Sequence, residues 1–320
     1  MPLLSSLSPP PSPASSTDPL PLTIGMLGCG NMGKALARAW VKRGVVAPER
    51  LLISARTTAQ STAEELGAQA VSPQELLLTA DVVILGVKPQ QLPQLNTLWA
   101  EFIPHPSSSS PQHPFAEPSF SSSTSDLHSR LFVSLLAGVS CEALPLAPPS
   151  LTPCLGRTLN DALVRVMPNI PVEISQGATL AYSPTPLSEL HSEAIDKLFG
   201  AVGLLEWLSS EEQFHAGTAI SGCGPAYLWV MIEALADAGV AQGLSRAVAQ
   251  RLAAQTMLGS GAMALEAHPA LLKDRVTSPG GVTIEGVRAL ERAGVRSALI
   301  EAVACATSRS QALDQASRTP

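Results

Sequence analysis

Short apolar runs alternate with stretches of helical periodicity up to about residue 182. The apolar runs predict strands, and they lie at Leu22–Leu27, Leu51–Ser54, Asp81–Leu85, Leu131–Leu136, Ala162–Met167 and Thr179–Tyr182. The stretches between them predict helices over Asn31–Gly44 and Thr58–Gly67 and near Gln91–Phe102. Strands that are apolar throughout are typical of a sheet covered on both faces. The pattern therefore predicts an α/β fold with a doubly wound, Rossmann-type parallel sheet.

From about residue 209 onward the strand pattern stops and helical periodicity continues. Helices dense in Ala and Leu are predicted over Pro225–Val240, Ser245–Glu266, Gly281–Ala293 and Val295–Ala312. Few of them have a strongly charged face, so we expect much of this region to be buried, part of it against a second copy of the chain. The predicted organisation is a sheet domain at 22–208 followed by an all-helical dimerisation domain at 209–320.

Three segments rich in Pro and Ser stand outside this pattern, at 1–21, about 104–130 and about 145–157. They bury too little apolar surface to offset the entropy of ordering them, so we expect a disordered tail and two disordered inserts. The alternative is that they are polyproline ligands for a partner. The insert at 104–130 lies between a helix and the next strand, which places it at the amino edge of the sheet, away from the ligand edge.

Composition narrows the functional classes. The 320 residues include 20 Lys+Arg and 26 Asp+Glu, a net charge of −6 without a basic block, which argues against a nucleic-acid or anionic-membrane surface. Five cysteines without a C-x-x-C pair and six histidines without H-E-x-x-H predict neither a disulfide framework nor a metal site. The chain has no apolar run of the ~18 residues that a membrane span needs. We expect a cytoplasmic protein, with organellar import left open.

A G-x-G-x-x-G motif joins the first predicted strand to the first predicted helix. Its glycines are Gly28, Gly30 and Gly33, with Asn31 and Met32 before the last one. The first glycine permits the tight turn, the second lets a pyrophosphate approach the backbone, and the third lets the helix pack on the strand. Amides at the helix start then face the phosphates. The motif in this position predicts a dinucleotide site.

The end of the second strand favours one dinucleotide over the other. An Asp or Glu there would bind the ribose hydroxyls of NAD, but this chain has Ser54 and Arg56. With no carboxylate to repel a 2′-phosphate and a guanidinium to pair with it, NADPH is the favoured cofactor, and NADH stays possible. The alternative for Arg56 is a solvated loop charge.

Two more loops follow predicted strands at the same edge. Val87, Lys88 and Pro89 follow one strand, and the proline requires an extended Lys88. We expect this loop to hold the cofactor through its backbone, the alternative being an exposed lysine at a helix start. Asn169 follows another strand, and its side chain can donate and accept, as a cofactor contact requires, or simply form a turn.

A Ser-Pro-Gly-Gly-x-Thr segment predicts an anion site in the helical region. Ser278 is expected to cap a helix with Pro279 in its first turn, and Gly280 and Gly281 leave the helix start bare of side chains. Free amides and the positive end of the helix dipole suit a carboxylate, with the hydroxyls of Ser278 and Thr283 as further donors.

No nucleophile–base pair, catalytic lysine arrangement or metal cluster stands out in the sequence. Hydride transfer to a carbonyl usually needs a proton donor, whereas a protonated imine already carries its activating charge and needs mainly orientation. The absence therefore fits an imine substrate. Cys29 and Cys223 are interpreted as small apolar side chains and not as redox groups.

These motifs resemble those of the pyrroline-5-carboxylate reductases. The resemblance rests on Gly25–Gly33, Val87–Pro89, Met167–Asn169, Gly177–Thr179 and the run VTSPGGVTIEGVRALE at Val276–Glu291. It implies a homodimer or higher oligomer with interleaved helical domains. It also implies that NADPH reduces the imine carbon of 1-pyrroline-5-carboxylate to give L-proline, the last step of proline biosynthesis.

The resemblance also implies roles for particular residues. It places the substrate carboxylate at Ser278, Gly280, Gly281 and Thr283, and the nicotinamide between Val87–Pro89 and Ser221–Pro225. Glu266 matches a pocket carboxylate, its alternative being a solvated charge at a helix end. Cys223 and Ile170 depart from the family pattern, which commonly has serine and threonine there.

Two other functions stay open. A reductase of another cyclic imine acid, or of a keto acid, would share the fold, although keto-acid dehydrogenases rely on a lysine and Ser221–Trp229 has none. A catalytically silent protein that binds NADP and regulates a partner would keep the dinucleotide motif, but it has no use for a carboxylate pocket.

Overall fold

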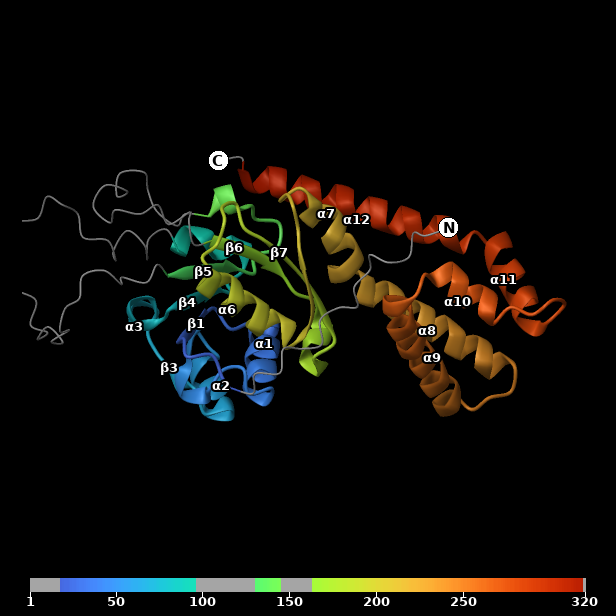
Figure 1. The fold of residues 1–320 in the computed structure, drawn as a ribbon, viewed down its shortest axis with the longest axis horizontal. Helices are drawn as coiled ribbons and strands as arrows, with labels where there is room; N and C mark the ends of the chain where they lie inside the picture. Colours follow the sequence, from blue (N-terminus) through green and yellow to red (C-terminus); the bar gives the residue numbers. More distant parts are fainter. Residues whose placement is uncertain (1–17, 96–129, 145–162, 319–320) are drawn as a thin grey trace, which may run out of the picture.

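The computed structural model describes residues 18–95, 130–144 and 163–318, which form a sheet domain and a helical region beside it (Figure 1). The sheet has the strand order β3-β2-β1-β4-β5-β6-β7-β8. Its strands are β1 (Ile24–Leu27), β2 (Leu51–Ser54), β3 (Gln69–Ala70), β4 (Val82–Leu85), β5 (Leu131–Ser134), β6 (Leu163–Met167), β7 (Gly177–Tyr182) and β8 (Gly203–Trp207). The Rossmann-type architecture is confirmed, and the predicted Pro/Ser segments lie almost entirely outside the described residues.

The prediction of a fully parallel sheet is wrong at one pair of strands. Strands β6 and β7 are antiparallel, with Met167 opposite Leu180, while every other neighbouring pair is parallel. The physical reason is the short connection over 168–176, because a parallel crossover needs a dozen or more residues. Strands β1, β2, β4, β5 and β6 still end at one edge, which carries the predicted site loops.

Helices cover both faces of this sheet. One face carries α1 (Asn31–Lys42), α2 (Ala59–Leu66) and α6 (Glu189–Gly200), and the other carries α3 (Pro73–Thr79). Trp40 of α1 locks the first of these layers, since its indole N–H donates to the Leu198 carbonyl at 2.6 Å and its ring meets Phe199 edge to face at 5.8 Å. The prediction of a disordered tail over 1–21 is wrong at Leu20, which packs into this core and donates its N–H to the Val45 carbonyl at 2.8 Å.

Short 3₁₀ turns complete the sheet domain, at η1 (Pro48–Arg50), η2 (Pro89–Gln91), η3 (Cys141–Ala143) and η6 (Ile170–Ile174). Residues 92–95 continue η2 as helix, and the rest of the helix predicted near Gln91–Phe102 lies outside the described residues. Sequence periodicity missed α3, α6, β3 and β8. The strands β3 and β8 contain exposed or half-buried positions, so they lack the apolar run that marked the central strands.

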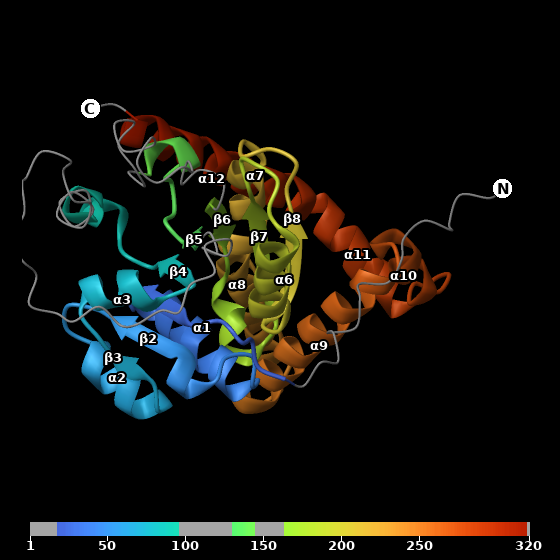
Figure 2. The same ribbon diagram turned by 60° about the vertical axis from the view of Figure 1, so that its left-hand side comes forward.

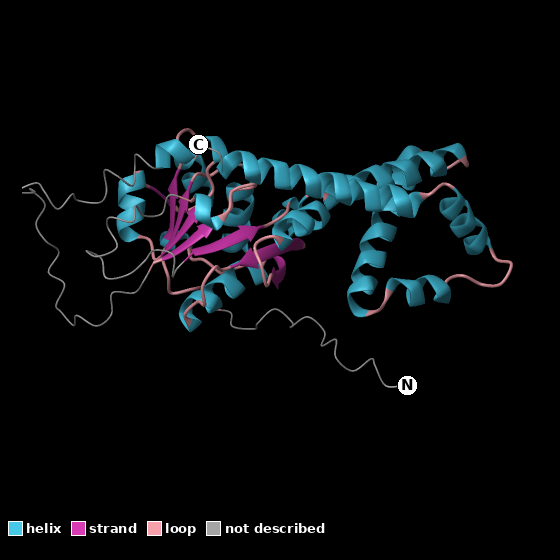
Figure 3. Cartoon of the chain, turned by 90° about the horizontal axis from the view of Figure 1, so that it is seen from above, coloured by secondary structure: helices cyan, strands magenta, loops and turns pink. Residues whose placement is uncertain are grey.

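The helical region consists of α7 (Gln213–Gly217), a π-helical turn η7 (Thr218–Gly222), α8 (Gly224–Ala241), α9 (Arg246–Glu266), α10 (Pro269–Arg275), α11 (Val282–Arg292) and α12 (Val295–Arg318). Helices α8 to α11 stand away from the sheet (Figure 1), and the long helix α12 returns from them to the sheet domain (Figures 2 and 3). The predicted helices are confirmed here, with α7, η7 and α10 added.

The predicted burial of this region is wrong for a single chain. Among α8 to α11 only Ala236, Ala249 and Ala253 are buried, while large apolar side chains such as Trp229 and Val282 are exposed, the latter by 93%. An apolar surface of this kind marks a contact with another protein surface. The low charge of these helices is therefore explained by burial that one chain cannot provide.

Candidate dinucleotide and substrate sites

The turn after β1 and the turn after β4 touch through two glycines. Gly28 has φ +89°, and a Cβ on it would lie 2.7 Å from the backbone nitrogen of Val87. A Cβ on Gly86 would lie 2.3 Å from the carbonyl oxygen of Gly28, and the Gly86 N–H donates to the Leu27 carbonyl at 2.9 Å. This close approach, which requires glycine on both sides, places Val87 beside the dinucleotide motif.

Gly30 faces open space at the start of α1. A Cβ on this residue would meet nothing within 4 Å, and the helix that it caps has no side-chain cap. The amides of Asn31, Met32 and Gly33 precede the first intrahelical bond, which Lys34 N–H makes to the Gly30 carbonyl. The first turn of α1 thus presents backbone donors and a positive dipole end to an anion.

The loop after β2 is tied to the same turn. The Ser54 carbonyl accepts the Gly28 N–H at 2.7 Å, and the Thr58 hydroxyl donates to the Cys29 carbonyl at 3.0 Å. The Ser54 side chain is buried, and the residue contacts the turn through its backbone carbonyl. Arg56 is exposed and has no ion pair within the described part of the chain, which leaves its guanidinium available to a ligand.

The loop after β4 is held by its own hydrogen bonds. Lys88 has the extended conformation expected before a proline, with φ −75° and ψ 148°. Its N–H donates to the side chain of Gln91 at 3.0 Å, and its carbonyl accepts the Gln91 N–H at 2.8 Å. The Lys88 side chain is exposed, and the cofactor contacts predicted for Val87, Lys88 and Pro89 stay predictions.

The side-chain amide of Asn169 is engaged in hydrogen bonds within the chain. It follows β6 and is 7% exposed. Its Nδ2 donates to the Ser221 carbonyl at 2.9 Å, and its Oδ1 accepts the Ala178 N–H at 2.8 Å. The side chain thus joins three segments of the chain, and its predicted contact with the cofactor stays a prediction.

The Ser-Pro-Gly-Gly turn precedes α11 and does not belong to it. The expected cap at Ser278 is wrong, because α11 starts at Val282 with Gly281 as its N-cap. The Gly281 N–H donates to the Ser278 carbonyl at 3.0 Å, Gly280 has φ +65°, and a Cβ on Gly281 would lie 2.2 Å from the Ser278 hydroxyl oxygen. The glycines therefore form a tight turn that leaves the helix start without a side-chain cap, with Thr283 exposed in its first turn.

The predicted dinucleotide site at Gly28–Gly33 and the predicted carboxylate site at Ser278–Thr283 are two half-sites that do not meet within one chain. Helices α10 and α11 lie at the far end of the helical region from β1 and α1 (Figure 1). Glu266 is the last residue of α9 and is exposed. A site that combines Ser278–Thr283 with Gly28–Gly33 therefore requires a second copy of the chain, whose helical region would reach the nucleotide edge of the first.

Two cysteines are protonated thiols in this fold. Burial raises the pKa of Cys29 to about 11 and that of Cys141 to about 12. A thiol needs its thiolate form to act as a nucleophile or redox group. This supports the interpretation of Cys29 as an apolar side chain, and no group of metal-ligating side chains occurs among the described residues.

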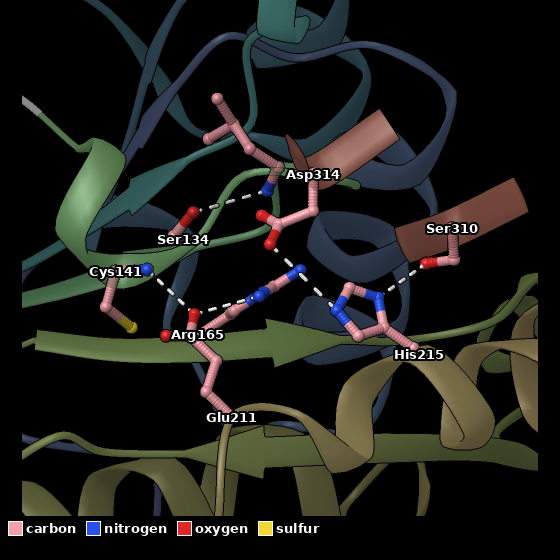
Figure 4. A network of polar contacts seen from close by, with 8 residues as sticks. Ser134, Cys141, Arg165, Glu211, His215, Ser310 and Asp314 are labelled. Carbon is pink, nitrogen blue, oxygen red and sulfur yellow. Dashed lines mark hydrogen bonds and ion pairs between the residues drawn. The ribbon is translucent and has the colours of Figure 1, made fainter. Parts of the chain in front are cut away.

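A largely buried ion pair that the sequence did not suggest joins strand β6 to the segment before α7 (Figure 4). Arg165 of β6 pairs with Glu211 at 2.8 Å, and their side chains are 6% and 20% exposed. Glu211 also accepts the Cys141 N–H at 2.7 Å, and the Arg165 guanidinium lies 4.5 Å from the centre of the Phe214 ring. The pair thus links β6, η3 and the start of α7.

The end of α12 is attached to the same network (Figure 4). His215 Nδ1 forms a 3.0 Å hydrogen bond with the Ser310 hydroxyl, and its Nε2 lies 3.9 Å from a carboxylate oxygen of Asp314. Both partners are on α12, which begins just after α11. The network therefore anchors the carboxyl end of α12 to the sheet domain, while the amino end of α12 follows α11.

Replacing Arg165 with methionine is expected to lower the free energy of unfolding by about 3 kcal/mol, because it leaves the Glu211 carboxylate in a largely buried site without its cation. Urea denaturation of the purified protein measures this. Lys197→Met is the matched control, since its ion pair with Glu193 is partly exposed and contributes less than about 1 kcal/mol. Equal effects of the two substitutions would contradict the role given to the buried pair.

Comparison with known proteins bears on both halves of the chain. Residues 211–313 match a family model described as pyrroline-5-carboxylate reductase dimerisation, and residues 23–105 match one described as NADP oxidoreductase, coenzyme F420-dependent. A relative named pyrroline-5-carboxylate reductase from Glycine max is 35% identical over 95% of this chain and 98% of its own length. The chain belongs to the pyrroline-5-carboxylate reductase family.

Solved structures of the pyrroline-5-carboxylate reductase family share the fold. The enzyme from Coxiella burnetii superposes with a TM-score of 0.73 at 29% identity, covering 91% of this chain and 98% of its own. The enzyme from Plasmodium falciparum, solved with NADP bound, has a TM-score of 0.70 at 26% identity, covering 92% and 98%. The resemblance inferred from the sequence motifs is therefore confirmed.

Proposed function

We propose that this chain is an NADPH-preferring pyrroline-5-carboxylate reductase that forms L-proline. Bound NADPH would supply the hydride that adds to the imine carbon. The observation that carries the proposal is the open start of α11 behind the Ser-Pro-Gly-Gly turn, in a chain 35% identical to a named reductase over nearly its whole length. NADH is the weaker alternative for the cofactor.

The nucleotide edge fits a dinucleotide. Gly30 leaves space that a Cβ would fill, and the backbone donors of Asn31, Met32 and Gly33 point toward that space from the start of α1. Arg56 is exposed and unpaired within the described residues, so it is free to meet a 2′-phosphate. The loop at Val87–Pro89 lies against the same turn and would border the nicotinamide half.

The start of α11 would hold the carboxylate of the substrate. Gly280 and Gly281 keep side chains away from its first amides, and the hydroxyls of Ser278 and Thr283 lie on either side of them in sequence. A protonated ring imine carries its own activating charge, so these groups need only orient the acid and no general acid is required. Glu266 would add a negative charge that favours the iminium form.

The complete site would form between two subunits. Residues 213–241 are the one described stretch long and apolar enough, by length and composition, to cross a membrane, and only 17% of its most apolar window is buried in the chain. This stretch lies within the part that matches the family's dimerisation segment. Its exposed apolar side chains are therefore assigned to contacts with a second copy, and the protein is a homo-oligomer.

We also propose a cytoplasmic location for this soluble protein. All four cysteines in the described part of the chain are free thiols. Free buried thiols are usual in a reducing compartment.

The first test follows NADPH oxidation with 1-pyrroline-5-carboxylate, with a six-membered cyclic imine acid and with a simple keto acid. Fast turnover confined to the five-membered substrate is expected, because the carboxylate turn and the cofactor would hold that ring in one orientation. Binding of NADPH without turnover of any of the three would replace the proposal with an NADP-binding regulatory protein.

Thr283→Ala is expected to raise the KM for the imine acid roughly tenfold, because it removes one hydroxyl donor to the carboxylate, while the KM for NADPH changes less than about twofold. Steady-state kinetics with each substrate varied in turn measure both constants. Thr283→Ser keeps the hydroxyl and serves as the control. Equal increases in the two KM values would show that the residue supports the turn and does not bind the substrate.

A further inference from the structure

The π-helical turn between α7 and α8 contains a carbonyl that the helix itself does not satisfy. The Cys223 N–H donates to the Thr218 carbonyl at 2.9 Å, the i to i+5 bond of a π turn. In a regular helix the Ser221 carbonyl would accept the N–H of residue 225. That residue is Pro225, which has no N–H, and the next amide, of Ala226, donates to the Cys223 carbonyl at 3.0 Å.

Asn169 supplies the donor that the helix lacks. Its Nδ2 lies 2.9 Å from the Ser221 carbonyl oxygen, and the side chain is almost fully buried. An unsatisfied carbonyl in a part-buried position costs free energy, so this hydrogen bond favours the position of the turn in which it forms.

The other end of the same side chain replaces a missing strand contact. The pairing of β6 with β7 stops at Met167 and Leu180, after which Pro168 takes the chain out of the sheet. The Ala178 N–H of β7 therefore has no strand partner there, and Asn169 Oδ1 accepts it at 2.8 Å. Asn169 is thus fixed to the sheet by one atom and holds the π turn by another.

Close packing leaves little freedom between these parts. A Cβ on Gly217 would lie 2.5 Å from a methyl carbon of Leu180, and one on Gly222 would lie 3.7 Å from the terminal methyl of Met167. The end of α7 therefore packs against β7, and the end of the π turn lies beside Met167, the last residue of β6. A shift of the turn would require the Asn169 hydrogen bond to break.

This contact lies at the nucleotide edge of the sheet, which is the edge where β1 and β6 end and where the G-x-G-x-x-G turn lies. Strand β6 lies three places from β1 in the strand order, about 14 Å at the usual spacing of ~4.8 Å, and both strands end at the same edge. A dinucleotide whose pyrophosphate lies at the turn after β1 extends along that edge. The reacting end of the cofactor would therefore lie near the π turn.

We propose that Asn169 is a positioning residue: through the Ser221 carbonyl it fixes Ser221–Pro225 relative to the nucleotide edge, and this sets the alignment of the cofactor's reacting ring with the imine. Its catalytic consequence rests on the proposed function. This role differs from a direct contact with the cofactor, because one donor and one acceptor of the Asn169 amide already serve the fold.

Asn169→Asp separates the two bonds of this side chain. The carboxylate keeps an acceptor for the Ala178 N–H but has no donor for the Ser221 carbonyl. We expect kcat to fall roughly tenfold or more, because misplacement of a bordering segment disturbs the geometry of transfer, while the dissociation constant of NADPH changes less than about threefold. A loss confined to NADPH affinity would overturn the proposal in favour of a cofactor contact.

Pro225→Ala provides a second-site test. It places an N–H where the Ser221 carbonyl can accept it, so the helix no longer depends on Asn169. Asn169→Asp is then expected to lower kcat less than about threefold in a chain that already carries Pro225→Ala, against roughly tenfold in the wild-type chain. A direct contact with the cofactor predicts the same factor in both chains, and that result would overturn the proposal.

Hydrogen exchange of the peptide covering 217–226 gives a readout independent of activity. Exchange of the amides of Gly222, Cys223, Gly224 and Ala226 is expected to be faster in Asn169→Asp than in the wild type and to return toward the wild-type rate in the double variant, whose new amide at position 225 is left out of the comparison. Unchanged exchange in Asn169→Asp would contradict the docking role of Asn169. A wild-type protein that does not reduce pyrroline-5-carboxylate would instead refute the proposed function and leave this exchange result valid.

Discussion

Replacing Arg56 with aspartate is expected to lower the preference for NADPH over NADH by about a hundredfold. The change removes a charge-assisted pair with the 2′-phosphate, worth about 1.5–3 kcal/mol, and adds a carboxylate that repels this phosphate and accepts the ribose hydroxyls of NADH. Arg56 is exposed and has no ion partner in the described chain, so its own fold interactions do not oppose the change. The ratio of kcat/KM for the two cofactors measures the effect.

Arg43→Asp is the charge-matched control for this substitution. Arg43 is exposed at the carboxyl end of α1, whereas the phosphates are expected at the amino end of the same helix. The two variants have the same net charge, so a general electrostatic effect on an anionic cofactor would appear in both. An unchanged cofactor ratio in Arg56→Asp, or an equal change in the two variants, would remove the assignment of Arg56 to the 2′-phosphate.

Gly30→Ala and Gly86→Ala are expected to separate binding from folding. The added methyl at position 30 meets nothing in the protein but fills the space in front of the first amides of α1, so the KM for NADPH should rise about a hundredfold. Its cost to folding is at most about 1 kcal/mol, because alanine is a poorer N-cap than glycine. At position 86 the methyl would lie 2.3 Å from the Gly28 carbonyl oxygen, a backbone atom that cannot rotate away.

Gly86→Ala should therefore lower the free energy of unfolding by about 3 kcal/mol or more, and weaken NADPH binding as a result. Urea denaturation and NADPH titration of both variants give the two quantities. Wild-type NADPH affinity in Gly30→Ala would show that the cofactor does not pass in front of this residue. A stable Gly86→Ala would show that the turns after β1 and β4 do not need their close approach.

Local chemistry explains why several parts of the site were predictable. A G-x-G-x-x-G run between an apolar strand and a helix has one well-known geometry, and the structure has Gly28 at a positive φ there. The expected extended conformation of Lys88 follows from Pro89 alone. The Ser-Pro-Gly-Gly run predicted a helix start bare of side chains, although α11 begins three residues later than a cap at Ser278 would require.

Other parts depend on segments that are distant in the sequence. The pairing of Asn169 with Ser221 spans 52 residues, and the network of Arg165, Glu211 and His215 with the end of α12 brings together four elements. The local sequence around each of these residues does not predict which distant residue it contacts. Pro225 gives a partial signal, since a proline just inside a helix deprives the Ser221 carbonyl of its donor.

The sequence by itself determined the class of fold, the strand-to-helix turn at Gly28–Gly33 and a helix start without a side-chain cap after the Ser-Pro-Gly-Gly run, because each depends on residues close together in the chain. Only the tertiary structure decided the antiparallel pairing of β6 with β7, the contact of Gly28 with Gly86, and the distance between the two half-sites within one chain. These features depend on which strands and helices become neighbours. Neighbours are chosen by the packing of the whole molecule, and here also by a second subunit that covers the apolar helices.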